Sequence, residues 1–141
     1  AHVGARPPTQ AHSQTPERGA SLSLFLAEHR VVSVVFLQLR GLGARLCDVA
    51  SATAAQRAVC RVQQVAGAHR AAVMRLIADD KGIRFLLACG VPGFAAADDA
   101  WRAVKVALRC TMELEWFGLS CKSGITSGRM FCGEAGSALR A

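Results

Sequence analysis

The sequence predicts an α+β domain in which helices cover one face of a mainly antiparallel sheet. Three observations predict this class. Residues 31–39 form an apolar run of strand length, and residues 79–82 form a polar turn between two further apolar runs. Residues 44–66 and 100–116 carry apolar side chains at broadly helical spacing and separate the strands. Strands and helices mixed in this order are typical of a sheet with helices packed against it.

We expect one folded domain preceded by a lead-in. A chain of 141 residues has the length of a single domain with a buried core. The first residues are rich in Pro, Gln, Ser, Thr and Ala without a period, as in a linker or disordered segment. We therefore divide the chain into a lead-in, residues 1–28, and a folded domain, residues 29–141. The run SLSLFLA (21–27) is too short for a signal peptide, and no apolar run is long enough to span a membrane.

The chain is basic, with a formal net charge of +7, but its basic residues are scattered. It has no Lys/Arg run, no tyrosine and no alternation of basic and aromatic residues of the kind that stacks on nucleic-acid bases. We therefore expect no nucleic-acid partner. A basic nucleic-acid binder built on a ferredoxin-like sheet stays as the weakest alternative.

The six cysteines are widely spaced among apolar neighbours and contain no C-x-x-C pair. This spacing disfavours a zinc site. Small buried thiols in a reducing compartment are the simplest interpretation, and they indicate a cytoplasmic protein.

The first strand, residues 31–39, is apolar on both of its alternating faces. A strand of this kind is covered on both sides. Helices can cover one side in a small domain, so we expect a second layer or a partner on the other. The helix over residues 44–66 follows, with Gly67 as its stop.

The second half of the domain begins with a hairpin of strands 72–78 and 83–89. The acidic pair Asp98–Asp99 then suits the start of the helix at 100–116. We expect two more strands, 119–126 and 129–133, with a turn at Ser127–Gly128. The apolar stripe of the second helix, which we place in the core, consists of Trp101, Val104, Leu108 and Met112. The element order fits a ferredoxin-like sandwich.

Four segments resemble, in order, the catalytic domain of class III nucleotide cyclases. These segments are VVSVVFLQLRGLG (31–43), DKGIRFLLACGVPG (80–93), DDAWRAVKVALRC (98–110) and GITSGRMFCGEAGSALR (124–140). In that family they correspond to a strand with Phe-x-Asp-Ile, a hairpin followed by Gly-x-Pro, a helix, and a Gly-rich strand region. The resemblance covers nearly all of the expected domain, which stops short of the family's C-terminal end.

The hairpin and the segment TSGRMFCG (126–133) are most similar to the second cyclase domain of soluble, bicarbonate-responsive adenylyl cyclases. The resemblance implies two domains paired head to tail with ATP between them. In such a pair the first domain supplies two aspartates that bind Mg or Mn, and the second supplies recognition of the base. We therefore expect a first-type cyclase domain as partner and no cofactor bound by this chain alone.

The two metal positions of the family are degenerate in this sequence. The first aspartate corresponds to Gln38, and the second to Gly82 or Ile83, depending on a one-residue choice of register. A neutral amide is a poor ligand for a hard dication. Asp79 and Asp80 are alternative ligands, although we favour a role for them in the hairpin turn. We expect neither a metal site nor a catalytic residue on this chain.

Three further residues are candidates for other roles. Arg75 lies where the soluble cyclases have a lysine that contacts the base, and a solvated surface arginine is the alternative. The resemblance aligns Arg140 with a family arginine, which makes it a possible anion contact. Phe36 is the expected interface residue, because Phe36→Asp would place a charge in a desolvated face.

The sequence thus predicts the second-type half of an adenylyl cyclase, which converts ATP to cyclic AMP and diphosphate only when it is paired with a metal-bearing domain. The alternative is a non-catalytic cyclase-homology domain that acts as a dimerisation or regulatory scaffold.

Overall fold

A computed structural model describes residues 27–40, 42, 48–79 and 81–133. The structure comprises six elements in the order β1(Glu28–Arg40), α1(Val49–Ala68), β2(Ala72–Asp79), β3(Gly82–Cys89), α2(Asp99–Trp116) and β4(Ser120–Cys132). The predicted α+β class is confirmed. β1 begins at Glu28, and residues 1–26 of the predicted lead-in lie outside the described part of the chain.

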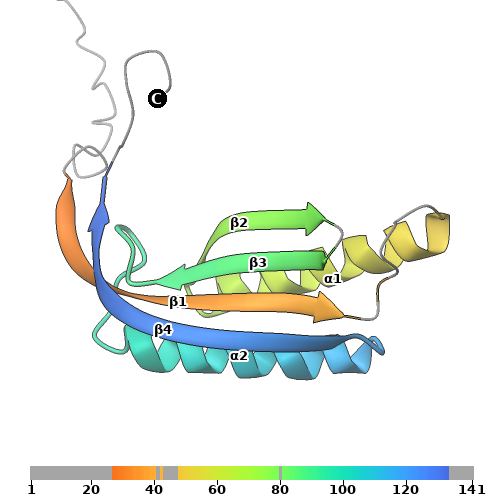
Figure 1. The fold of residues 1–141 in the computed structure, drawn as a ribbon. Coiled ribbons are helices and arrows are strands. Elements are labelled where there is room, and N and C mark those ends of the chain that lie inside the picture. Colours follow the sequence, from red (N-terminus) through yellow and green to blue (C-terminus); the bar gives the residue numbers. More distant parts are fainter. Residues whose placement is uncertain (1–26, 41, 43–47, 80, 134–141) are drawn as a thin grey trace, which may run out of the picture.

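The four strands form one sheet in the order β2-β3-β1-β4, and every neighbouring pair is antiparallel. This order and the β-α-β-β-α-β sequence of elements are those of the ferredoxin-like sandwich. Both helices lie on the same side of the sheet, while the described residues leave its other face without a covering layer (Figure 1). We call this uncovered side the open face.

The core lies between the sheet and the two helices. Its largest fully buried side chains are Phe85, Leu37, Leu87 and Leu114. Burial raises the pKa of the Cys110 thiol to about 12, and it also raises the pKa of Cys89. The described cysteines are all free. The predicted burial holds for Cys89 and Cys110, which belong to this core, whereas the other described cysteines are half-buried.

Each helix starts where its sequence provides a cap or an ion pair. Asp48 accepts a hydrogen bond from the Ser51 backbone N–H (2.8 Å) and so caps α1; residues 44–47 of the predicted helix lie outside the described residues. At the start of α2, the buried Arg102 contacts Asp99 and donates to the carbonyl oxygens of Phe94, His69 and Arg70. These bonds fix the start of α2 against the loops beside it.

The prediction of two strands at 119–126 and 129–133 was wrong. β4 runs without interruption from Ser120 to Cys132. Ser127 and Gly128 pair with Ser33 and Val32 of β1, and the hydroxyl oxygens of Ser33 and Ser127 lie 2.6 Å apart. The Ser-Gly pair therefore takes part in the β1–β4 ladder instead of forming a turn, and Gly128 is not among the glycines with positive φ.

The prediction that the stripe of α2 lies in the core was also wrong. Trp101, Leu108 and Met112 are 58%, 58% and 60% exposed. The face of α2 that packs on the sheet carries Leu114 and mostly smaller side chains, namely Ala103, Val106, Ala107 and Cys110. Small side chains let the helix axis approach the sheet closely.

Candidate functional site

The candidate site lies on the open face. Directly paired residues of antiparallel strands share a face, so the strand register shows which side chains meet there. One row joins Arg75, Leu86, Phe36 and Gly124, and the next row joins Ile77, Arg84, Gln38 and Lys122. Basic and amide side chains therefore gather at the end of the open face that is formed by the β2–β3 hairpin.

Among the described residues, this polar end of the open face contains more cations than anions. Arg75 and Lys122 are exposed; Arg84 shares a row with Gln38 and Lys122, and Arg75 lies one row further along the sheet. Asp79, the acidic residue beside them, forms an ion pair with Arg84. The remaining positive charge suits an anionic ligand such as a phosphate group. The sequence alone does not identify Arg84 and Lys122 as residues of this site, because only the strand register places them next to Gln38.

The structure brings together the two positions that the resemblance aligns with metal-binding aspartates. Gln38 donates a hydrogen bond from Nε2 to the carbonyl oxygen of Lys81 (3.1 Å), the residue before Gly82. Ile83 is buried in the core at 5% exposure, so a side chain at that position points away from the open face. Gly82 has a φ of +99°, and a Cβ there would lie 3.1 Å from the Leu39 carbonyl oxygen. Of the two alternative positions for the second aspartate, Gly82 lies beside Gln38 and Ile83 does not.

The Asp79 carboxylate makes two contacts within the β2–β3 hairpin. Its carboxylate accepts a hydrogen bond from the backbone N–H of Lys81 (3.0 Å) and pairs with Arg84. These contacts are those expected of a residue that closes the hairpin turn. Asp80 lies outside the described residues. Within the described ranges, no group of three or more His, Cys, Asp or Glu side chains is arranged to hold a metal ion.

Phe36 and Arg75 lie in the same row of the open face. Phe36 is 41% exposed despite its position in the middle of β1, because no helix covers that side. Arg75 lies next to a bulge in β2 between Val73 and Arg75, which locally changes the register with β3. Arg140, the possible anion contact, lies outside the described residues.

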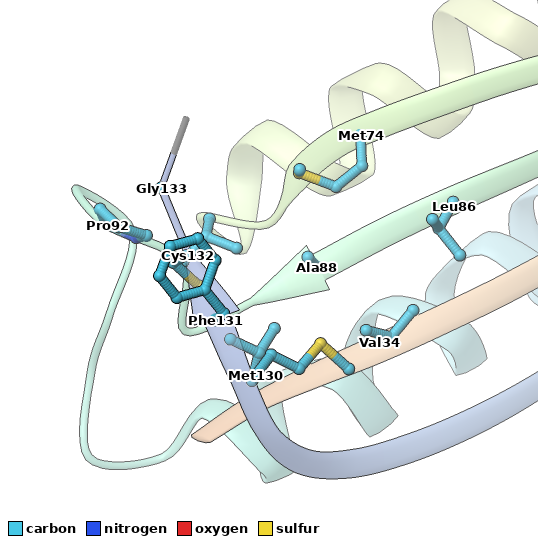
Figure 2. Close-up of a pocket in the computed structure, with 11 residues that line it drawn as sticks. Val34, Met74, Leu86, Ala88, Pro92, Met130, Phe131, Cys132 and Gly133 are labelled. Carbon is cyan, nitrogen blue, oxygen red and sulfur yellow. The ribbon is translucent and has the colours of Figure 1, made fainter. Parts of the chain in front are cut away.

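An apolar pocket occupies the other end of the open face. Its volume is about 460 Å³. Figure 2 shows side chains from β1, β2, β3 and β4 around it, among them Val34, Met74, Leu86, Met130 and Phe131. The open face thus combines an apolar depression at one end with basic side chains at the other.

A scan of family models and a search of curated protein sequences found no match. Solved structures do match. The adenylyl cyclase CyaB from P. aeruginosa superposes with a TM-score of 0.70 at 18% identity, over 82% of this chain and 65% of that one. The guanylyl cyclase domain of the RhoGC fusion protein from the aquatic fungus Blastocladiella emersonii gives 0.66 at 18% identity, over 79% and 65%. A bacterial light-regulated adenylyl cyclase gives 0.64 at 15% identity, over 80% and 61%.

The chain has the fold of a class III nucleotide cyclase catalytic domain. The fold predicted from the four sequence segments is therefore confirmed. The chain spans less than two thirds of the length of these cyclase structures. Adenylyl and guanylyl cyclases share the cyclase fold, so the choice of nucleotide depends on individual side chains. No helix in the described part of the chain is both long and apolar enough to cross a membrane.

Proposed function

We propose that this chain is the second-type half of an adenylyl cyclase, which completes an ATP site when it pairs with a metal-bearing cyclase domain. One observation carries the proposal: the open face has a basic end, and the two degenerate metal positions beside it, Gln38 and Gly82, provide no carboxylate. A domain with this surface can bind an anionic nucleotide but needs its metal ligands from elsewhere.

In the proposed pair, Mg or Mn bound by the partner's aspartates would activate the ribose 3′ hydroxyl and offset the phosphate charge. The bond from the 3′ oxygen to the α-phosphorus forms, and the bond from that phosphorus to diphosphate breaks. The chain's own contribution is to position the nucleotide. Arg75 donates hydrogen bonds to the base from the fork of its guanidinium group, and Phe36 lies against the partner.

The test is complementation. The chain is mixed with a first-type cyclase domain, and cyclic AMP and cyclic GMP are measured separately with magnesium or manganese. We expect cyclic AMP formation well above that of the partner alone, and none from the chain alone. If the chain does not stimulate its partner, the proposal is wrong. If cyclic GMP exceeds cyclic AMP, the assignment of ATP is wrong while the half-site assignment stands.

A second candidate function is a non-catalytic scaffold that pairs with a cyclase domain without binding nucleotide. The loss of carboxylates at Gln38 and Gly82 favours it as well. Titration calorimetry of ATP into the paired domains separates the two functions, because a scaffold gives no heat of binding beyond that of the partner alone. The free thiols of the described cysteines support a reducing compartment, and we propose the cytoplasm for either function.

A further inference from the structure

The outer side of α2 carries an apolar ridge whose larger side chains are exposed in the described structure, while Val104 is half-buried. Val104, Leu108, Met112 and Trp116 follow one another at intervals of four residues, and we call them the α2 ridge. Leu108 and Met112 are more than half exposed, and Trp116 is 88% exposed. The buried side of α2 points to the sheet, so the ridge faces away from the sheet and from the open face (Figure 1).

The ridge is confined to α2. The neighbouring α1 exposes polar side chains, including Gln56, Gln63 and Gln64. Trp101 extends the apolar surface by one turn toward the start of α2 and is 58% exposed, with Lys105 Nζ lying 5.6 Å from the centre of its ring. An apolar surface on one helix beside a polar neighbour is typical of an interaction site.

The residues of the α2 ridge are arranged symmetrically along the helix, before and after the level of Cys110. Leu108 and Met112 lie two residues before and after Cys110, and Val104 and Trp116 lie six residues before and after it. When two copies of α2 cross in antiparallel orientation at this level, Leu108 of each copy meets Met112 of the other. Val104 of each copy then lies toward Trp116 of the other.

The charges beside the ridge have the same symmetry. Lys105 lies five residues before Cys110, and Glu115 lies five residues after it. An antiparallel crossing therefore places Lys105 of each copy opposite Glu115 of the other and forms two equivalent ion pairs. Lys105 is half-buried, and the exposed Arg109 is already paired with Glu113 of its own copy (3.2 Å). No like charges are opposed in this arrangement.

The area is sufficient for a weak, specific dimer. If both copies bury most of the exposed surface of the ridge, roughly 800 Å² is removed from water, which is within the range of weak interfaces. We infer that the α2 ridge is a homodimerisation surface on which a second copy of this chain packs antiparallel about Cys110. Because this contact leaves the open face accessible, it goes beyond the proposed function and joins two half-sites back to back.

The experiment is sedimentation equilibrium of the full chain over a range of micromolar concentrations. We expect a reversible monomer–dimer equilibrium. Leu108→Ser should weaken it at least tenfold, because Leu108 lies at the centre of the crossing, whereas Gln63→Ser, at an exposed site on α1, should leave it unchanged. Phe36→Asp should also leave it unchanged, which separates this dimer from pairing through the open face. Circular dichroism checks that each variant is folded.

Charge reversal tests the antiparallel register. Lys105→Glu and Glu115→Lys should each weaken self-association. In a dimer of either variant, both inter-copy contacts between positions 105 and 115 join side chains of the same charge. An equimolar mixture of the two variants should form a heterodimer of restored affinity, because both ion pairs then join opposite charges again. A wild-type chain that stays monomeric, a dimer insensitive to Leu108→Ser, or a mixture that does not recover would each overturn the inference.

Discussion

Gln38 donates a hydrogen bond from its side-chain amide to the carbonyl oxygen of Lys81, at 3.1 Å, and so joins the end of β1 to the β2–β3 hairpin. The two residues belong to the segments in which the cyclase family is expected to carry its two metal carboxylates. An aspartate at position 38 has no proton to donate to that carbonyl. The hydrogen bond therefore depends on an amide at the position where the resemblance predicts a metal-binding aspartate.

Replacement of Gln38 by Asp should destabilise the domain. The variant loses the hydrogen bond to Lys81 and opposes a carboxylate to a carbonyl oxygen, so we expect a loss of about 1 kcal/mol in the free energy of unfolding. Urea denaturation followed by circular dichroism measures this. Gln63→Asp, at an exposed site on α1, is the matched control. Equal stability of the Gln38→Asp variant and the wild type would show that the hydrogen bond contributes nothing.

Replacement of Arg75 by Ala should weaken nucleotide binding in the paired domains. The loss of hydrogen bonds from a charged donor predicts a rise in the nucleotide KM of about tenfold. Arg57→Ala is the control, because Arg57 lies on the helix side of the sheet, 5.3 Å from the ring centre of Phe117. An unchanged KM in the Arg75 variant would identify Arg75 as a solvated surface residue. Arg75→Lys then shows whether nucleotide binding needs the several donors of the guanidinium group or only its positive charge.

Replacement of Phe36 by Asp should abolish pairing with a cyclase partner while the domain stays folded. Phe36 is partly exposed on the open face, so the charge is tolerated in the isolated domain but is desolvated in a complex. Val49→Asp makes the same chemical change at the exposed start of α1 and should leave pairing intact. Co-sedimentation with the partner domain measures both variants. If the Phe36 variant pairs normally, this residue lies outside the interface.

Replacement of Arg102 by Met should cause the largest loss of stability among these variants. The Arg102 side chain is 9% exposed, pairs with Asp98 (3.3 Å) and Asp99, and satisfies three backbone carbonyls. Removal of one partner from a buried ion pair costs about 3–5 kcal/mol. The exposed pair of Arg109 with Glu113 provides the control, because Arg109→Met should cost less than about 1 kcal/mol. Urea denaturation distinguishes these two magnitudes.

The stability of the domain should fall as the pH rises above about 9. The pKa of Cys110 is raised from 9.0 to about 12 by burial, so the folded state keeps a proton that the unfolded state loses between these values. The Cys110 contribution is fully present below pH 9 and is lost as the pH approaches 12. The chain has no tyrosine to titrate in the same window. Cys110→Ala should reduce the slope of unfolding free energy against pH, and the buried Cys89, whose pKa is also raised, should keep part of that slope. An unchanged slope would contradict this account.

Local sequence signals predicted most of the fold. The run at β1, the polar turn before β3 and the acidic start of α2 each correspond to an observed element. Two predictions failed where the local signal was ambiguous. A Ser-Gly pair is compatible with a turn or with a strand. In β4 it is part of the strand, because Ser127 pairs with Ser33 of β1.

The second failure concerned α2, whose sequence carries apolar residues on two sides. Helical periodicity identifies both sides but does not say which one faces the sheet. Close packing selected the side with Ala103, Ala107 and Cys110, and left the larger Leu108 and Met112 exposed.

The sequence by itself determined the fold class and the absence of carboxylates at Gln38 and Gly82, because both depend on residue type and order along the chain. Only the tertiary structure decided which side chains share the open face. Arg75, Arg84 and Gln38 come from three different strands, and their proximity follows from the strand register. That register is set by long-range pairing and by burial of the opposite face, which no local pattern specifies.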